Sequence, residues 1–196
     1  MFRKILYFNL FLGITTLHLI FGQRTHHEIV ALKKEQFSLP NRKFYIQQIH
    51  CDFKQPKYFI SRKGLFNKQQ PFVLGDSVQK VVLNYLKPSN TYKGGLVPII
   101  MKIKELKVRE ERHFLNEDGS TKISAEFYVY ADKGIAKIYQ ANAFRTYSGF
   151  MNITTQHEEN IREVIKSCLT DFNNAKIDFS QYIIPNKIFK AKHTPY

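Results

Sequence analysis

Acidic residues are scarce in this sequence. Of its 196 residues, 30 are Lys or Arg and only 16 are Asp or Glu, so the formal net charge is +14 at pH 7. A field of this sign attracts anionic partners such as lipid head groups, lipopolysaccharide, acidic glycans or nucleic acid. The basic residues are scattered along the whole chain, so a simple solvated surface is the alternative explanation.

Cysteine is also rare, with Cys51 and Cys168 as the two examples. Each lies on the apolar side of its expected element, which favours two buried small side chains. A disulfide between them stays open, because an exported protein matures under oxidising conditions. His50 precedes Cys51, but neighbours on a strand point to opposite faces, and this argues against a catalytic Cys–His pair.

Sequence motifs of enzymes and metal sites are missing. The chain has no Gly-x-Ser-x-Gly elbow, no Gly-x-x-x-x-Gly-Lys loop and no Cys-x-x-Cys pair. His157 and Glu158 begin like a zinc-protease helix, but position 161 is Ile where a second histidine is required. Thr155 and Glu158 instead form the pattern of a capping box. We therefore expect no catalytic residue, no metal ligand and no cofactor.

A group of acidic residues leaves one enzymatic alternative open, because glycoside cleavage needs only two carboxyl groups at the right separation. The candidates are Glu105, Glu110, Glu111, Glu117 and Asp118. The last two lie in an expected turn and the others lie among basic residues, so surface ion pairing is the preferred explanation. The alternative function is a small secreted hydrolase with an unrecognised active site.

Only one long apolar run is present, and it lies near the N-terminus. Arg3 and Lys4 precede apolar residues that end at Gly22, which is the pattern of a cleavable signal peptide over residues 1–22. The run is shorter and more polar than the about 20 apolar residues that span a bilayer. Residue 23 is Gln and not the cysteine that a lipid anchor needs. We expect an exported protein, periplasmic or secreted, with no transmembrane span after cleavage and with nucleic acid as an unlikely partner.

The expected mature chain divides into three parts. Residues 23–41 are polar and basic and form an N-terminal arm, residues 42–184 form a single domain, and residues 185–196 form a basic C-terminal tail with two prolines. A domain of this length can bury a sufficient core without disulfides.

Apolar periodicity predicts two main amphipathic helices in the domain, one over 77–86 and one that follows the capping box up to Phe172. Between them, alternating apolar residues predict three strands, at 97–112, 121–132 and 135–147, joined as an antiparallel meander. A further strand is expected at 44–53. The sequence thus predicts an α+β fold, with an antiparallel sheet of four to five strands and both helices packed on one face.

The alternation in the strand at 97–112 slips by one residue, which predicts a β-bulge near Lys104 and Glu105. With this bulge, four basic residues face the solvent side of the sheet. They are Lys102, Lys104, Lys107 and Arg109, here called the basic strip. We predict that the basic strip contacts a polyanion or a membrane surface. The alternative is that these charges only prevent pairing between sheet edges.

The order of elements from Leu96 to Phe172 resembles the small periplasmic auxiliary proteins of ABC-type lipid and organic-solvent transport, and related envelope lipoproteins. Val97-Pro98 opens the long strand, Ser124 to Tyr130 form the central one, and His157-Glu158-Glu159 opens the last helix. The Phe-Gly-Gln sequence at 21–23 is similar to signal-peptide exits of exported Bacteroidota proteins. Unlike those auxiliary proteins, this chain has no cysteine for lipidation at the cut.

Charge, export signal and resemblance together imply an exported, non-enzymatic protein of the envelope or the medium. It would bind a partner protein or an anionic lipid or glycan surface, or serve as an accessory of a transport machine.

Overall fold

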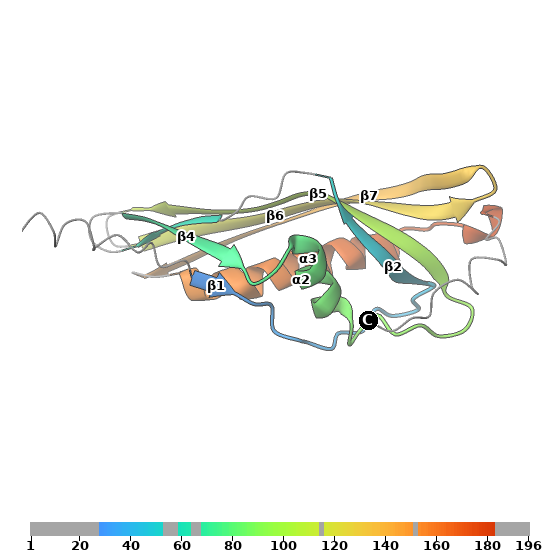
Figure 1. Ribbon diagram of the computed structural model, residues 1–196, viewed down its shortest axis with the longest axis horizontal. Coiled ribbons are helices and arrows are strands. Elements are labelled where there is room, and N and C mark those ends of the chain that lie inside the picture. Colours follow the sequence, from blue (N-terminus) through green and yellow to red (C-terminus); the bar gives the residue numbers. More distant parts are fainter. Residues whose placement is uncertain (1–27, 53–58, 64–67, 114–115, 151–152, 183–196) are drawn as a thin grey trace, which may run out of the picture.

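The computed structural model describes residues 28–52, 59–63, 68–113, 116–150 and 153–182 (Figure 1). The expected signal peptide, residues 1–22, and the expected C-terminal tail, residues 185–196, lie outside these ranges. The strands are β1 (Glu28–Val30), β2 (Phe44–Cys51), β3 (Phe59–Lys63), β4 (Lys68–Leu74), β5 (Val97–Arg112), β6 (Asn116–Ala131) and β7 (Gly134–Phe150). The helices are α2 (Val78–Leu86) and α3 (His157–Asn174), with short 3₁₀ turns η1 (Thr154–Gln156) and η2 (Phe179–Gln181). Among the described residues, no helix is long and apolar enough to cross a membrane.

The main sheet has the strand order β2-β5-β6-β7, and its fold class is α+β as predicted. β5, β6 and β7 form the predicted antiparallel meander. The prediction of a purely antiparallel sheet is wrong, because β2 pairs with β5 in parallel, from Phe44 opposite Val97 to Cys51 opposite Ile103. β3, β4 and α2 form the crossover that a parallel pair requires. Side-chain alternation shows which face a residue occupies but not the direction of the neighbouring strand.

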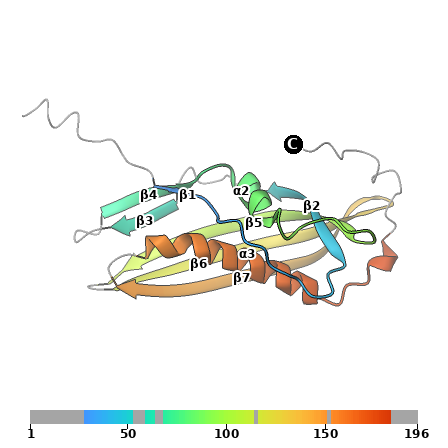
Figure 2. The same cartoon turned by 90° about the horizontal axis from the view of Figure 1, so that it is seen from below.

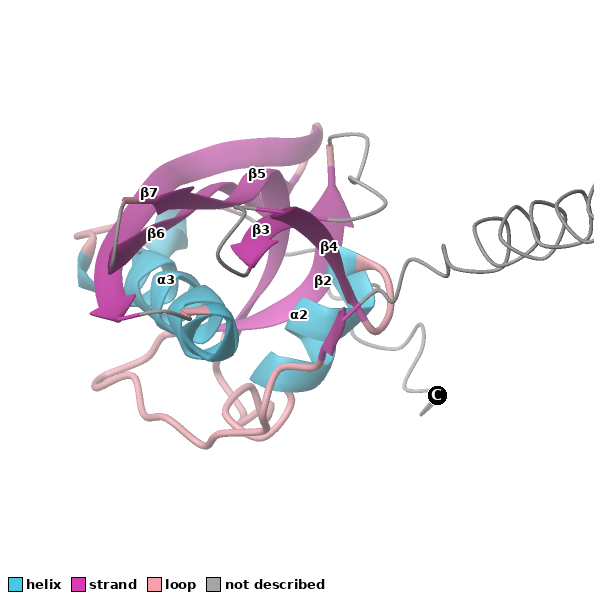
Figure 3. Ribbon diagram, turned by 90° about the vertical axis from the view of Figure 1, so that its left-hand side faces the viewer, coloured by secondary structure: helices cyan, strands magenta, loops and turns pink. Residues whose placement is uncertain are grey.

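A second, smaller sheet has the order β1-β4-β3, with β1 parallel to β4 and β3 antiparallel to β4. It lies beside the main sheet, and β3 runs against β5 (Figure 3). β1 belongs to the segment that the sequence sets apart as an N-terminal arm. Farther along this segment, the backbone N–H of Lys33 donates to Glu158 Oε1 at 2.6 Å, and the Phe37 ring stacks on Tyr85 at 5.8 Å. The described part of the arm is therefore packed against both helices.

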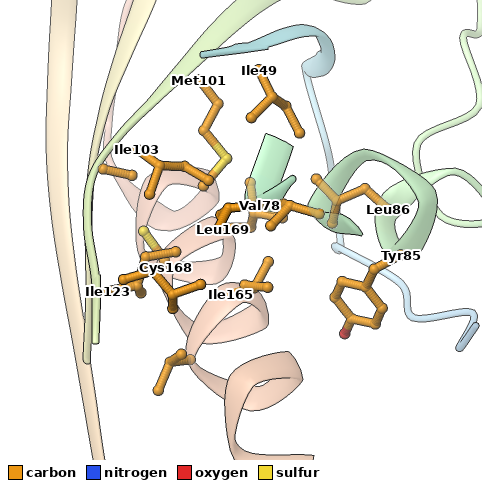
Figure 4. Packing of buried hydrophobic residues seen from close by; sticks show 14 of the residues in the cluster. Ile49, Val78, Tyr85, Leu86, Met101, Ile103, Ile123, Ile165, Cys168 and Leu169 are labelled. Atoms are coloured by element: carbon orange, nitrogen blue, oxygen red, sulfur yellow. The ribbon is translucent and has the colours of Figure 1, made fainter. Parts of the chain in front are cut away.

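The hydrophobic core lies between the main sheet and the two helices, which both cover the same face of the sheet (Figures 2 and 3). The predicted apolar stripes are the buried faces of α2 and α3, and they meet the inward residues of β5 and β6 (Figure 4). At one end of this core the rings of Phe127 and Phe172 stack with centroids 4.1 Å apart and planes 7° from parallel. Phe44 packs on Phe172 at 4.5 Å, which joins β2 to the same cluster.

The helix starts differ from each other. Ser77 caps α2, since its Oγ accepts the backbone N–H of Lys80 at 3.4 Å. The predicted capping box at α3 is not formed: the cap residue Gln156 makes no side-chain cap bond. The turn η1 leads directly into α3, and Glu158 instead bonds to Arg162 and to the arm. A 3₁₀ turn before a helix offers other partners to its first N–H groups, which the local sequence pattern does not reveal.

Cys51 and Cys168 are not joined by a disulfide in the structure. Cys168 is fully buried on α3, and burial raises the pKa of its thiol to about 12, because the apolar surroundings disfavour the thiolate. Cys51 is partly buried at the end of β2.

We expect iodoacetamide to alkylate Cys51 in the folded protein and to reach Cys168 only after denaturation, because the thiolate is the reacting species. Peptide mass spectrometry of the alkylated protein, with and without urea, measures the two sites separately. Equal labelling of both sites without urea, or a disulfide between them, would contradict the packing of Cys168.

Candidate functional site

The two faces of the main sheet differ in what covers them. α2 and α3 lie on one face, and alternate residues of β5, β6 and β7 point to the opposite side, here called the outer face (Figure 3). The predicted bulge is present, as a register shift between Ile103 and Glu105. After it, Lys107 and Arg109 are exposed while Val108 is buried. The outer face therefore carries the exposed side chains of Lys107 and Arg109, as the alternation predicts.

The first half of the basic strip is partly neutralised within the protein. Lys102 Nζ lies 3.1 Å from Asp52 Oδ2, and Lys104 Nζ contacts the same oxygen. The hydrogen bonds from Lys104 and then Lys102 lower the pKa of Asp52, and the bond to Asp52 raises the pKa of Lys104. One carboxylate thus serves two lysines at the junction of β2 and β5.

The second half of the strip keeps its charge exposed. Within the described part of the chain, neither Lys107 nor Arg109 has an ion-pair partner. Lys107 lies opposite Lys122 of β6, whose Nζ is 3.0 Å from Glu105 Oε2. Lys107 and Arg109 are therefore the basic residues of this region without an acidic partner among the described residues, while Lys122 is paired.

A hollow of about 450 Å³ lies on the outer face beside the first half of the strip. Its lining residues are Gln48, His50, Cys51, Asp52, Ile100, Lys102, Tyr128 and Ile135. The lining combines apolar and polar side chains, and Tyr128 donates its hydroxyl to Glu126 Oε2 at 2.6 Å. The Asp52–Lys102 pair gives the hollow a balanced polar wall rather than a charged one.

A buried polar chain lies on the other side of the sheet and was not predicted. His157 Nε2 is 2.9 Å from Glu110 Oε2, and His157 Nδ1 is 2.6 Å from the Tyr147 hydroxyl. The side chains of Glu110 and His157 are both 0 % exposed. The ring of Phe72 from β4 stacks on the imidazole at 5.0 Å, and burial raises the pKa of Tyr147 to about 12. The chain joins β5, β7, α3 and the small sheet.

A carboxylate, an imidazole and a hydroxyl in a row is the arrangement that activates nucleophiles in hydrolases. Here the imidazole of His157 is fully buried under Phe72, so a substrate has no access to it in this conformation. We therefore assign the buried polar chain to stability. Among the described residues, no group of three or more His, Cys, Asp or Glu side chains is placed to hold a metal ion.

The acidic residues considered for a carboxylate pair have separate roles. Surface ion pairing is confirmed for Glu105, with Lys122. Asp118 is on the surface, and its Oδ2 is 3.1 Å from His113 Nε2. The prediction of surface ion pairing is wrong for Glu110 and Glu117, which are buried at 6 % and 1 % exposure. The bulge turns Glu110 inward, and Glu117 lies in β6 rather than in a turn, where its Oε2 accepts the Ile153 N–H at 3.1 Å. The continued alternation after the bulge was the signal for Glu110.

Gly119 of β6 lies directly opposite Tyr147 of β7, and the tyrosine ring covers it. A Cβ at position 119 would lie 2.2 Å from Tyr147 Cε2, which is far closer than a carbon contact allows. Glycine therefore leaves the space that lets the Tyr147 hydroxyl reach His157.

Gly119→Ala is expected to displace the Tyr147 ring and to lower the free energy of unfolding by about 1–3 kcal/mol, the usual cost of overpacking. Gly94→Ala is the matched control, because a Cβ there meets nothing within 4 Å. Urea denaturation of both variants measures the difference. A Gly119→Ala protein as stable as the Gly94→Ala protein would contradict the close packing.

The described residues define a small α+β protein with an exposed, basic sheet face. No family model matches the sequence, and no curated protein matches it. Solved structures with some likeness include a DUF330 protein from Xanthomonas campestris, at 10% identity, covering 74% of this chain and 91% of that chain with a TM-score of 0.39. Another is a minor lipoprotein from Acinetobacter baumannii, at 14% identity, covering 67% and 84%, with a TM-score of 0.26. A likeness of this size carries no argument about the fold, partner or activity of this chain.

Proposed function

We propose that this chain is an exported, non-enzymatic protein that binds an anionic partner of the cell envelope through the outer face of its main sheet. The observation that carries the proposal is the exposed pair Lys107 and Arg109, which has no acidic partner among the described residues. Export is supported by the signal-peptide pattern of residues 1–22.

The two halves of the basic strip have different roles in this proposal. A ligand that contacts Lys102 or Lys104 must compete with Asp52, which already accepts from both. A ligand that contacts Lys107 or Arg109 displaces only water and counterions. Binding is therefore centred on the second half of the strip and weakens with salt, because exposed charges are screened at physiological ionic strength.

Retention on a heparin column tests the proposal, because heparin is a polyanion. The protein applied to the column is the chain that begins at Gln23. We expect retention at low salt that is lost on raising the salt, and a Lys107→Glu, Arg109→Glu variant that is no longer retained. The matched control is Lys87→Glu, Lys93→Glu, which changes the net charge equally at two exposed residues outside the outer face. Equal loss in both variants, or no retention of the unmodified chain, would overturn the proposed binding site.

Fractionation of cells that produce the full sequence tests export separately. We expect the protein outside the cytoplasm with Gln23 as its first residue. An intact Met1 on the exported protein would overturn the cleavage, and a cytoplasmic location would overturn the export.

A further inference from the structure

The second half of the basic strip has an aromatic neighbour. Lys107 of β5 lies opposite Lys122 of β6, which in turn lies opposite Phe144 of β7. These three residues form one row across the outer face. Adjacent strands are about 4.8 Å apart, so the row places Phe144 about 10 Å from the strand that carries Lys107. Phe144 is 65 % exposed although it is one of the largest apolar side chains.

The outer face of β7 carries three large apolar side chains among polar ones. Phe150 is also 65 % exposed and Ile135 is 58 % exposed, and both point to the same side as Phe144 in the β6–β7 register. β7 contains no Asp or Glu, and it is an edge strand in the order of the main sheet. Of the three, Phe144 is the one that lies in a row with the second half of the basic strip.

Charge and apolar surface are arranged side by side. Basic side chains of β5 and β6 lie next to the exposed rings of β7, and the row with Phe144 contains no acidic residue. Acidic residues do occur in other rows of this face: Glu105 is engaged by Lys122, Asp118 by His113, and Glu111 is exposed near the end of β5. The unpaired positive charge is therefore limited to Lys107 and Arg109, and Glu111 lies two residues beyond Arg109 on the same face.

We infer that the outer face docks on an anionic lipid bilayer. Phe144 enters the boundary between head groups and acyl chains, and Lys107 and Arg109 contact the lipid phosphates. Lys122 joins them by exchanging its bond to Glu105 for a phosphate. An anionic bilayer presents negative charge directly above apolar material, which matches basic side chains beside exposed rings. A soluble polyanion matches the charges but leaves Phe144 in water. This inference rests on the proposed function and names the partner of the same site.

The sequence contains no tryptophan, so a Phe144→Trp variant carries a single fluorescent reporter at the proposed contact. The probe is a vesicle of phosphatidylglycerol and phosphatidylcholine, with pure phosphatidylcholine vesicles as the neutral reference. We expect a blue shift of the emission, and quenching by brominated acyl chains, with the anionic vesicles alone. Ile29→Trp is the matched control, because Ile29 is 69 % exposed on β1, outside the main sheet, and its emission should not change.

Vesicle sedimentation measures the contribution of the ring itself. Phe144→Ser is expected to bind anionic vesicles about tenfold more weakly than the unmodified chain, because it removes one large apolar contact, while its retention on heparin stays unchanged. Ile29→Ser should behave as the unmodified chain in both assays.

The outcomes separate the two proposals. Heparin retention without vesicle binding, or a Phe144→Ser variant that binds vesicles normally, overturns the bilayer inference and leaves the proposed function standing. A chain that binds neither heparin nor anionic vesicles overturns both. Equal binding to neutral and anionic vesicles overturns the role of Lys107, Lys122 and Arg109 at the bilayer.

Discussion

Replacing His157 by leucine is expected to lower the free energy of unfolding by about 3–5 kcal/mol, because the buried carboxylate of Glu110 would then face a hydrocarbon side chain. The Tyr147 hydroxyl, 2.6 Å from His157 Nδ1, would lose this bond in the same step and keep the longer one to Thr121 Oγ1 at 3.5 Å. In a domain of this size such a loss lowers the melting temperature by roughly 10 °C. Thermal unfolding followed by circular dichroism measures it.

A double variant separates a buried charge from a simple packing defect. Glu110→Leu together with His157→Leu removes both partners, and replacing a buried pair by apolar residues is often neutral or stabilising. We therefore expect the double variant to recover the part of the stability that His157→Leu loses through the broken Glu110–His157 pair. His113→Leu is the surface control, because His113 is 65 % exposed beside Asp118, and it should change stability by no more than about 0.5 kcal/mol. A double variant less stable than His157→Leu alone would refute this explanation.

Phe172→Ala is expected to destabilise the protein by about 3–5 kcal/mol, the usual cost of removing a buried aromatic ring. Phe172 is 2 % exposed. The centroid of its ring lies 4.1 Å from that of Phe127, 4.5 Å from that of Phe44 and 5.7 Å from that of Tyr139. It therefore joins α3 to three strands of the main sheet, β2, β6 and β7. Urea denaturation of the purified variant, with the midpoint and slope compared with the unmodified chain, measures the loss.

Phe144→Ala is the control for Phe172→Ala, because it removes the same ring from an exposed position and should change stability by less than about 0.5 kcal/mol. Equal effects of the two substitutions would mean that the core does not lie where the structure places it. A stable Phe144→Ala protein also shows that weaker vesicle binding by position 144 variants is not caused by unfolding.

Much of the fold follows from side-chain periodicity. The stripes of α2 and α3, the meander β5-β6-β7 and the bulge after Ile103 are each predicted by local patterns of apolar residues. The parallel pairing of β2 with β5 is not, because it depends on where a long crossover returns the chain. The pairing of the strands in the small sheet is not predicted either, because β1, β3 and β4 share no pattern of apolar residues that would mark them as neighbours.

The candidate site was predicted in part. Alternation places Lys107 and Arg109 on the outer face, and the structure agrees. It does not show that Asp52 pairs with Lys102 and Lys104, because Asp52 follows a strand that is adjacent only in the folded sheet. The buried chain was missed for the same reason, since Glu110 and His157 come from distant elements that meet only in the folded core.

The parallel neighbour of β5 has a consequence for the order of folding. The chain from β5 through β6 and β7 to α3 is joined by short connections. Contacts among these elements therefore close only small loops. β2 pairs later, because its partner β5 comes after β3, β4 and α2 in the chain. If the chain crosses a membrane from its N-terminus, β2 arrives first and is paired late, with Phe44 and its apolar neighbours exposed meanwhile. We expect this strand to be the segment that a holding chaperone recognises during export.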